Sequence, residues 1–119
     1  MGEMEERRYT FPKAEKVRKK AEIDRIFRQG KRISYRGIDI RVVKNDLPVT
    51  RVVFVTVRSF RGAVERNTAK RRAREAWRLN KHRVAPGYDV ALVLYPEHTS
   101  FDEINSSLLF LLDKAGILQ

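Results

Sequence analysis

The sequence predicts a single α+β domain, an α/β sandwich with one mixed sheet of about four strands and about three helices in the order αβββαβα. Three observations indicate this class. Polar and apolar residues alternate over 38–42, apolar runs at 51–57 and 88–94 are typical of buried strands, and helical apolar spacing recurs before, between and after them. The 119 residues suit one domain with one modest core.

The first predicted helix precedes the sheet. Residues 1–12 are expected to form a flexible lead-in to it. Ile23, Ile26 and Phe27 have the i, i+3, i+4 spacing of one helix face, and Gly30 stands where a helix commonly ends. This spacing predicts a helix whose apolar face packs on the sheet.

The predicted strands differ in how apolar they are. The segment 38–42 alternates and reads as a half-buried strand, and the turn "KNDLP" follows it. The segment 51–57 is more apolar, so we expect it to be more central in the sheet. Together with the buried strand "YDVALVLYP" at 88–96, it encloses a basic helix. Two strands joined through a helix in this way are expected to be parallel.

The last predicted helix has clear start and stop signals. Ser100 opens a capping box with Glu103, and Gly116 follows the last apolar residue. One face carries the apolar residues Phe101, Ile104, Leu108, Leu111, Leu112 and Ala115.

The charge of the chain indicates an anionic partner. The formal net charge is +11 and the isoelectric point is about 10.4, which favours nucleic acid as that partner. The absence of cysteine excludes a disulfide framework, a thiolate metal site and a cysteine nucleophile. Neither a secretory signal nor a membrane-spanning run is recognisable, so we expect a cytoplasmic protein with no membrane partner.

The basic helix carries the strongest functional signal. Between Arg58 and Arg83 there are ten Lys or Arg residues against Glu65 and Glu75. A helical projection separates an apolar side (Ala69, Ala73, Ala76, Trp77) from a basic side (Asn67, Lys70, Arg71, Arg74, Arg78). A solvated helix face usually mixes charges of both signs, so this one-sided cluster favours phosphate binding over a plain surface role. Asn67 either binds RNA or caps the helix start.

The stretch "GAVERNTAKRRAREAW" resembles the signature of the bacterial ribonuclease P protein subunit. In that family an Arg-Asn-Arg helix continues with Lys-Arg and Arg-Glu. Thr68 replaces the third motif residue, so one cation of the pattern is absent. The resemblance extends over 13–116, through "IDRIFRQGK" upstream and "RLNKHRVAPGYDVALVL" downstream. The matching motif residues are Arg66, Asn67, Lys70, Arg71, Arg74 and Glu75.

The resemblance implies a left-handed strand–helix–strand crossover and two RNA-binding surfaces. The first is expected to contact the catalytic RNA and comprises Arg58, Arg61, Arg66, Asn67, Lys70, Arg71, Arg74 and Arg78. The second is a cleft between the first helix and the sheet, in which aromatic rings stack on bases of the 5′ leader of precursor tRNA. Its expected residues are Phe11, Lys16, Arg18, Lys19, Phe27 and Arg36. Phe27 is equally compatible with a core role.

The resemblance also implies that the active site is RNA, which uses Mg²⁺ to remove the 5′ leader, so the protein has no catalytic residue and no metal site. His82 and His98 have no partner at metal-ligand spacing and are expected at the surface or facing RNA. Asp89, at a strand start, and Asp102, at a helix start, are expected to have structural roles.

Other functions remain open on the residues alone. A ribosomal or other structural RNA-binding protein shares the basic balance and the sandwich. An independent metal nuclease needs clustered carboxylates or histidines, and none is recognisable in the sequence. A DNA-binding module is disfavoured, because the basic helix is expected to be held inside a crossover, without dimer symmetry.

Overall fold

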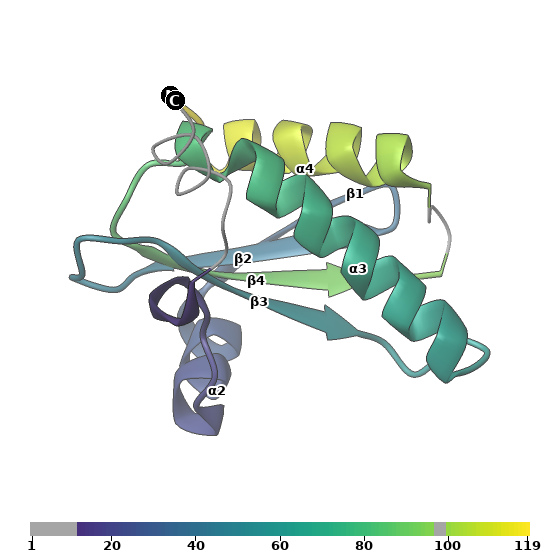
Figure 1. Cartoon of the computed structure of the whole chain (residues 1–119). Helices are drawn as coiled ribbons and strands as arrows, with labels where there is room; N and C mark the ends of the chain where they lie inside the picture. The colour runs from purple at the N-terminus through teal and green to yellow at the C-terminus, as the bar shows by residue number, and fades with distance from the viewer. Residues whose placement is uncertain (1–11, 97–99) are drawn as a thin grey trace.

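The computed structural model describes residues 12–96 and 100–119 of the chain (Figure 1). After a short 3₁₀ helix, the order of elements is αβββαβα, which confirms the predicted class and order. The elements are η1 (Lys13–Glu15), α2 (Lys20–Gln29), β1 (Lys31–Tyr35), β2 (Ile38–Lys44), β3 (Arg51–Thr56), α3 (Ala63–Asn80), η2 (Lys81–Arg83), β4 (Tyr88–Leu94) and α4 (Phe101–Lys114).

The four strands form one mixed sheet in the order β1-β2-β4-β3. β2 is antiparallel to both of its neighbours, and β3 and β4 are parallel, as predicted for the strand–helix–strand unit. The expectation that 51–57 is a central strand is wrong, because β3 lies at the edge and β4 occupies the interior. In β3, Val52 and Phe54 pack toward the main core and Val53 packs against the smaller core on the opposite face. The outer side of β3 is partly paired, because Val17 N–H donates to the Val52 carbonyl at 3.0 Å.

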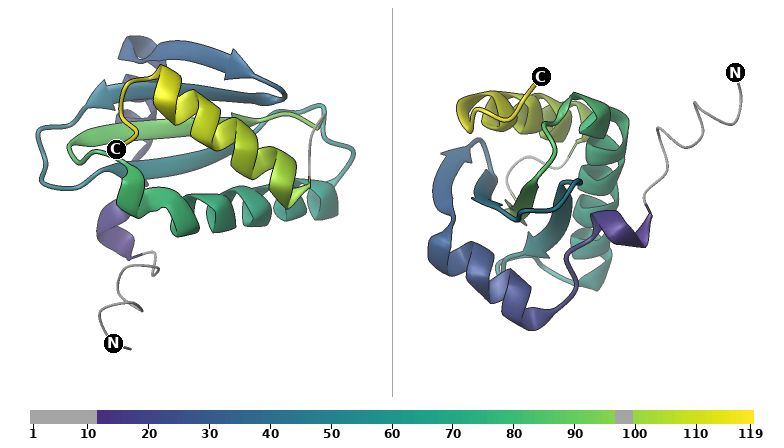
Figure 2. Two further views of the ribbon diagram at one scale, coloured as in Figure 1. Left: turned by 90° about the horizontal axis from the view of Figure 1, so that it is seen from above. Right: turned by 90° about the vertical axis from the view of Figure 1, so that its left-hand side faces the viewer.

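The crossover from β3 through α3 to β4 is left-handed. Figures 1 and 2 show α3 on one face of the sheet and β4 inserted between β3 and β2. In the left view of Figure 2, α3 lies between the viewer and the sheet. When that view is turned so that β3 and β4 run upward, β4 lies to the left of β3. Such units are right-handed in about 98% of proteins, so the hand is a distinctive property of this fold.

The main core lies between the sheet and the two long helices (Figure 2). β2 and β4 turn alternate residues toward it, and the sides of α3 and α4 predicted to be apolar meet there. Trp77 is buried together with Ala69, Ala73 and Ala76 of α3. The helix ends follow the predicted signals: Ser100 Oγ accepts from Glu103 N–H at 3.2 Å, and Gly116 has φ +77°.

The opposite face of the sheet, which we call the α2 face, is covered at one end. Ile26 of α2 packs with Val17, Val43 and Ala91 in a smaller core, and Phe27 borders it. Figure 1 shows α2 beneath one end of the sheet, while the arrowheads of β3 and β4 extend beyond it. The α2 face is therefore divided into an end under α2 and an end beyond it.

A buried ion pair joins β3 to β4. Asp89 is fully buried and accepts from Arg51 Nε at 2.8 Å and from Arg51 Nη2 at 2.6 Å, and Asn45 Nδ2 donates to it at 2.9 Å. Burial alone raises the pKa of Asp89, but the hydrogen bonds from Arg51 and Asn45 outweigh it, so the pKa lies below its usual value. This geometry agrees with the structural role expected of Asp89.

Candidate nucleic-acid interface

Helix α3 separates its residues as the projection predicted. Ala69, Ala73, Ala76 and Trp77 are buried, whereas Asn67, Arg71 and Arg74 are exposed and Arg66 is half-buried. α3 begins at Ala63 with Gly62 as the N-cap, so Asn67 lies a full turn inside the helix and does not cap it. The capping role considered for Asn67 is therefore excluded, and its amide faces solvent beside the arginines.

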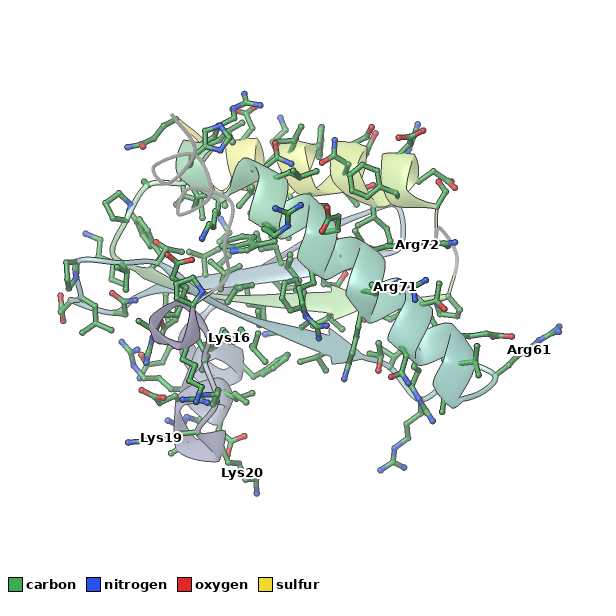
Figure 3. All side chains as sticks on the ribbon, in the orientation of Figure 1. Lys16, Lys19, Lys20, Arg61, Arg71 and Arg72 are labelled. Carbon is green, nitrogen blue, oxygen red and sulfur yellow. The ribbon has the colours of Figure 1, made fainter. Side chains whose placement is uncertain are left out.

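Two other residues of α3 lie off this basic side. Thr68 Oγ1 donates to the Val64 carbonyl at 2.9 Å, so the hydroxyl that replaces a motif cation bonds to its own helix. Arg72, one turn farther along α3, lines the same groove as Thr68, together with Phe60 and Pro96, on the other flank of α3 (Figure 3). Arg72 therefore places a cation beside the position of the missing one, away from the basic side of α3.

Arg78 is held by an acidic neighbour at the end of α3. Its Nη2 and Nε donate to the Glu75 carboxylate at 2.6 and 3.1 Å. The hydrogen bond from Arg78 lowers the pKa of Glu75. The excess positive charge of the helix is therefore concentrated toward its first three turns.

A basic groove joins α3 to the N-terminal segment. Lys16 and Arg18 line it from one side, Lys70 and Arg74 from the other, and Val52, Val53 and Phe54 form its floor. Its volume is about 280 Å³, and the Arg74 guanidinium lies 5.9 Å from the centre of the Phe54 ring. The described residues that line the groove include no acid. The structure thus brings together cations that the sequence assigned to two separate surfaces.

Phe27 forms a second part of the interface with a residue that the sequence analysis missed. The Arg41 guanidinium lies 5.2 Å from the centre of the Phe27 ring, and Arg41 Nη1 donates to the Phe27 carbonyl at 3.2 Å. Arg41 Nε is buried and has no hydrogen-bond acceptor among the described residues. The alternation in β2 could have identified Arg41, because it is a cation on the strand face toward α2.

The remaining predicted site residues are spread over the molecule. Arg58 and Arg61 are exposed in the connection before α3, and Arg61 points away from the body (Figure 3). Lys19 is the exposed N-cap of α2. Arg36, with φ +45°, lies in the β1–β2 turn, at the other end of the sheet from Phe27. Phe11 lies outside the described residues.

Neither a metal-binding group nor a membrane-spanning helix is present in residues 12–96 and 100–119. No group of three or more His, Asp or Glu side chains in these ranges is arranged to hold a metal ion. No helix there is long and apolar enough to cross a membrane. His82 is exposed, and His98 lies outside the described residues.

Comparison with known proteins identifies the family of the chain. The family described as Ribonuclease P matches residues 11–116. The ribonuclease P protein component of Pelotomaculum thermopropionicum is 35% identical over 103 residues, covering 85% of this chain and 92% of that relative. The corresponding protein of Syntrophobacter fumaroxidans is 36% identical over 110 residues, covering 89% of this chain and 92% of the relative.

Solved structures show the same fold. The RNase P protein of Thermotoga maritima superposes with a TM-score of 0.75 at 28% identity, over 84% of this chain and 96% of that one. The Staphylococcus aureus RNase P protein gives a TM-score of 0.80 at 23% identity, over 90% of this chain and 100% of that one. By sequence match and by fold, the chain belongs to the bacterial ribonuclease P protein family.

Proposed function

We propose that this chain is the non-catalytic protein cofactor of ribonuclease P, which binds the catalytic RNA through α3 and the 5′ leader of precursor tRNA through the grooves beside it. Family membership makes the ribonuclease P RNA and precursor tRNA its partners. The observation that carries the finer proposal is the one-sided cationic surface of α3, opposite a buried face of alanines and Trp77.

The outer side of α3 suits a folded RNA. Arg66, Asn67 and Arg71 follow one another along the exposed side of a rigid helix. Arginine forks bind phosphate oxygens in a bidentate manner, and contacts of this kind set the orientation of a protein on RNA without reading its sequence. This surface would therefore position the protein on the catalytic RNA.

The basic groove and the Phe27–Arg41 pair suit a single strand. The groove offers cations above an apolar floor, and Phe27 and Arg41 offer an aromatic ring and a planar guanidinium. Single-stranded nucleic acids are bound by this combination of cations along the backbone and rings beneath the bases. The buried Arg41 Nε–H supplies a donor for an acceptor on such a strand.

Mg²⁺-dependent hydrolysis is assigned to the RNA subunit. Asp89 is engaged with Arg51 and Asn45, and Asp39 with Arg32, Ser34 and Tyr95, so both buried carboxylates are used within the fold. The described residues also include no cluster suited to a metal ion. In this proposal the protein adds positive charge beside two polyanions, which lowers the Mg²⁺ needed for cleavage, and it acts in the cytoplasm.

The proposal is tested against the alternative of a purely structural RNA-binding protein by comparing two ligands. The assembled ribonucleoprotein is titrated with precursor tRNA and with mature tRNA, and the RNA subunit alone serves as the control. We expect the protein to increase affinity for the precursor selectively. An equal increase for both ligands would favour the structural alternative.

A further inference from the structure

A polar cluster lies at the end of the α2 face that α2 leaves uncovered. Asp39 is 5% exposed, although no described helix packs over this end. Its carboxylate accepts from Arg32 Nε at 3.0 Å, Ser34 Oγ at 2.5 Å and Tyr95 Oη at 2.8 Å. We call these four residues the Tyr95 cluster. Its members come from β1, β2 and the residue that follows β4.

Strand alternation places the cluster on the α2 face. Ser34 pairs with Asp39, and Asp39 pairs with Val93, so these residues form one row across three strands. Their neighbours Ile38 and Leu94 belong to the core on the other face. α2 sits at the far end of β2, where Arg25 Nη2 donates to the Lys44 carbonyl at 2.8 Å. The cluster therefore continues the surface that begins at Phe27 and Arg41.

The hydrogen bonds of Asp39 fix two flat side chains on this surface. Tyr95 is half-buried and is tied to the sheet by its hydroxyl, while the Arg32 side chain is 54% exposed. The hydrogen bond to Asp39 and burial both raise the pKa of Tyr95, so the hydroxyl remains a donor at neutral pH. A ring and a guanidinium held in place on an open sheet lose little entropy when they bind a flat ligand.

The surroundings of Tyr95 are basic and hollowed. A groove of about 290 Å³ is lined by Tyr95, Arg32, Ser34, Asp39 and the turn that carries Arg36. Two arginines face one carboxylate there, and that carboxylate is already engaged by three donors. Aromatic rings flanked by arginines are the usual contacts for unpaired bases and their phosphates.

We propose that Tyr95 stacks on an unpaired base of the 5′ leader, with Arg32 and Arg36 beside its phosphates. This inference rests on the proposed function, since it extends the path of the leader along the α2 face. Arg41 pairs with Ala91, and Tyr95 lies four residues farther along the chain of β4, so the two contacts are about 13 Å apart. Leaders long enough to cover both would bind more tightly than leaders that reach Phe27 alone.

The alternative is that the hydrogen bonds of the Tyr95 cluster only hold three strands together and bind no RNA. Two variants separate these roles. Y95F and Y95L both remove the hydroxyl and its bond to Asp39, but only Y95F keeps the ring. If the cluster has only a structural role, both substitutions should reduce leader binding equally. If Tyr95 stacks on a base, only Y95L should lose that contact. Thermal unfolding of each variant measures the structural effect independently of RNA.

The experiment uses the assembled ribonucleoprotein and precursor tRNAs whose leaders lengthen one nucleotide at a time. We expect affinity to rise in two steps with leader length, and Y95L to abolish the second step, about tenfold, while Y95F retains most of it. A second step unchanged in Y95L would overturn the role of Tyr95. Loss of every dependence on leader length in the wild-type protein would instead overturn the proposed function.

Discussion

The guanidinium of Arg41 lies over the ring of Phe27 and donates to the carbonyl of that same residue, which joins β2 to the last turn of α2. This pair presents a ring and a cation together at the covered end of the α2 face. We expect R41A and F27L each to reduce the preference of the ribonucleoprotein for precursor over mature tRNA by about 1–2 kcal/mol. Equilibrium binding of both tRNAs measures this. Unchanged preference in both variants would remove the pair from the leader path.

Gly30, which follows α2, allows the end of this helix to pack closely on β2 beside Arg41. A Cβ at Gly30 would lie 2.5 Å from the Ile26 carbonyl oxygen and 3.1 Å from Arg41 Cβ. We expect G30A to lower the free energy of unfolding by about 2 kcal/mol and to weaken leader binding, because α2 must shift away from β2. G62A is the matched control, since a Cβ there meets no atom within 4 Å. Urea unfolding of both variants checks this, and equal losses would contradict it.

The Arg51–Asp89 pair predicts how stability depends on pH. The folded pKa of Asp89 is lower than its unfolded value, so the pair contributes fully above about pH 4 and its contribution is lost as pH falls through the folded pKa. We expect D89N to lose about 3 kcal/mol of stability at pH 7 and to show a shallower decline in acid.

The control for that measurement is D113N, which removes an exposed carboxylate from α4. It should change stability by less than about 0.5 kcal/mol at pH 7. Urea unfolding at several pH values compares the three proteins. Equal acid slopes for D89N and the wild type would show that another group dominates the acid sensitivity.

The cations of α3 predict a salt effect. Replacing Arg61, which precedes α3, together with Arg66 and Arg71 by alanine should weaken binding to the catalytic RNA. The slope of log affinity against log salt should become shallower by about 2, since each phosphate contact contributes roughly 0.7 to 0.9. The control replaces the exposed Lys31, Lys44 and Lys114, which lie on β1, β2 and α4. The same flattening in both triple variants would mean that only net charge matters.

Local patterns predicted most of this fold. The side of α3 with Ala69, Ala73 and Trp77 is buried because small residues and one large ring at helical spacing can pack on a sheet in only one way. The position of β3 was not predictable in the same way. An apolar run indicates a strand that packs on the core, but whether it lies at the edge depends on where β4 inserts, and that is set by the crossover.

The site was predictable where one element carries it. The basic side of α3 follows from a single helical projection, whereas the basic groove depends on how the segment of Lys16 and Arg18 runs along β3. The resemblance implies that Arg36 and Phe27 share the leader cleft, yet a β-turn carries Arg36 to the far end of the sheet. Arg41 and Tyr95 become visible as site residues only once the strand register is known.

Cleavage of precursor tRNA at low Mg²⁺ is the most direct measurement. The cognate catalytic RNA is assayed alone, with the protein, and with the variant in which Arg66, Lys70 and Arg74 are alanine. A subunit that supports the RNA should make accurate 5′ cleavage possible at Mg²⁺ concentrations where the RNA alone is inactive, and the variant should need more Mg²⁺. Cleavage that is the same with and without the protein, despite tight binding to the RNA, would contradict the proposed function.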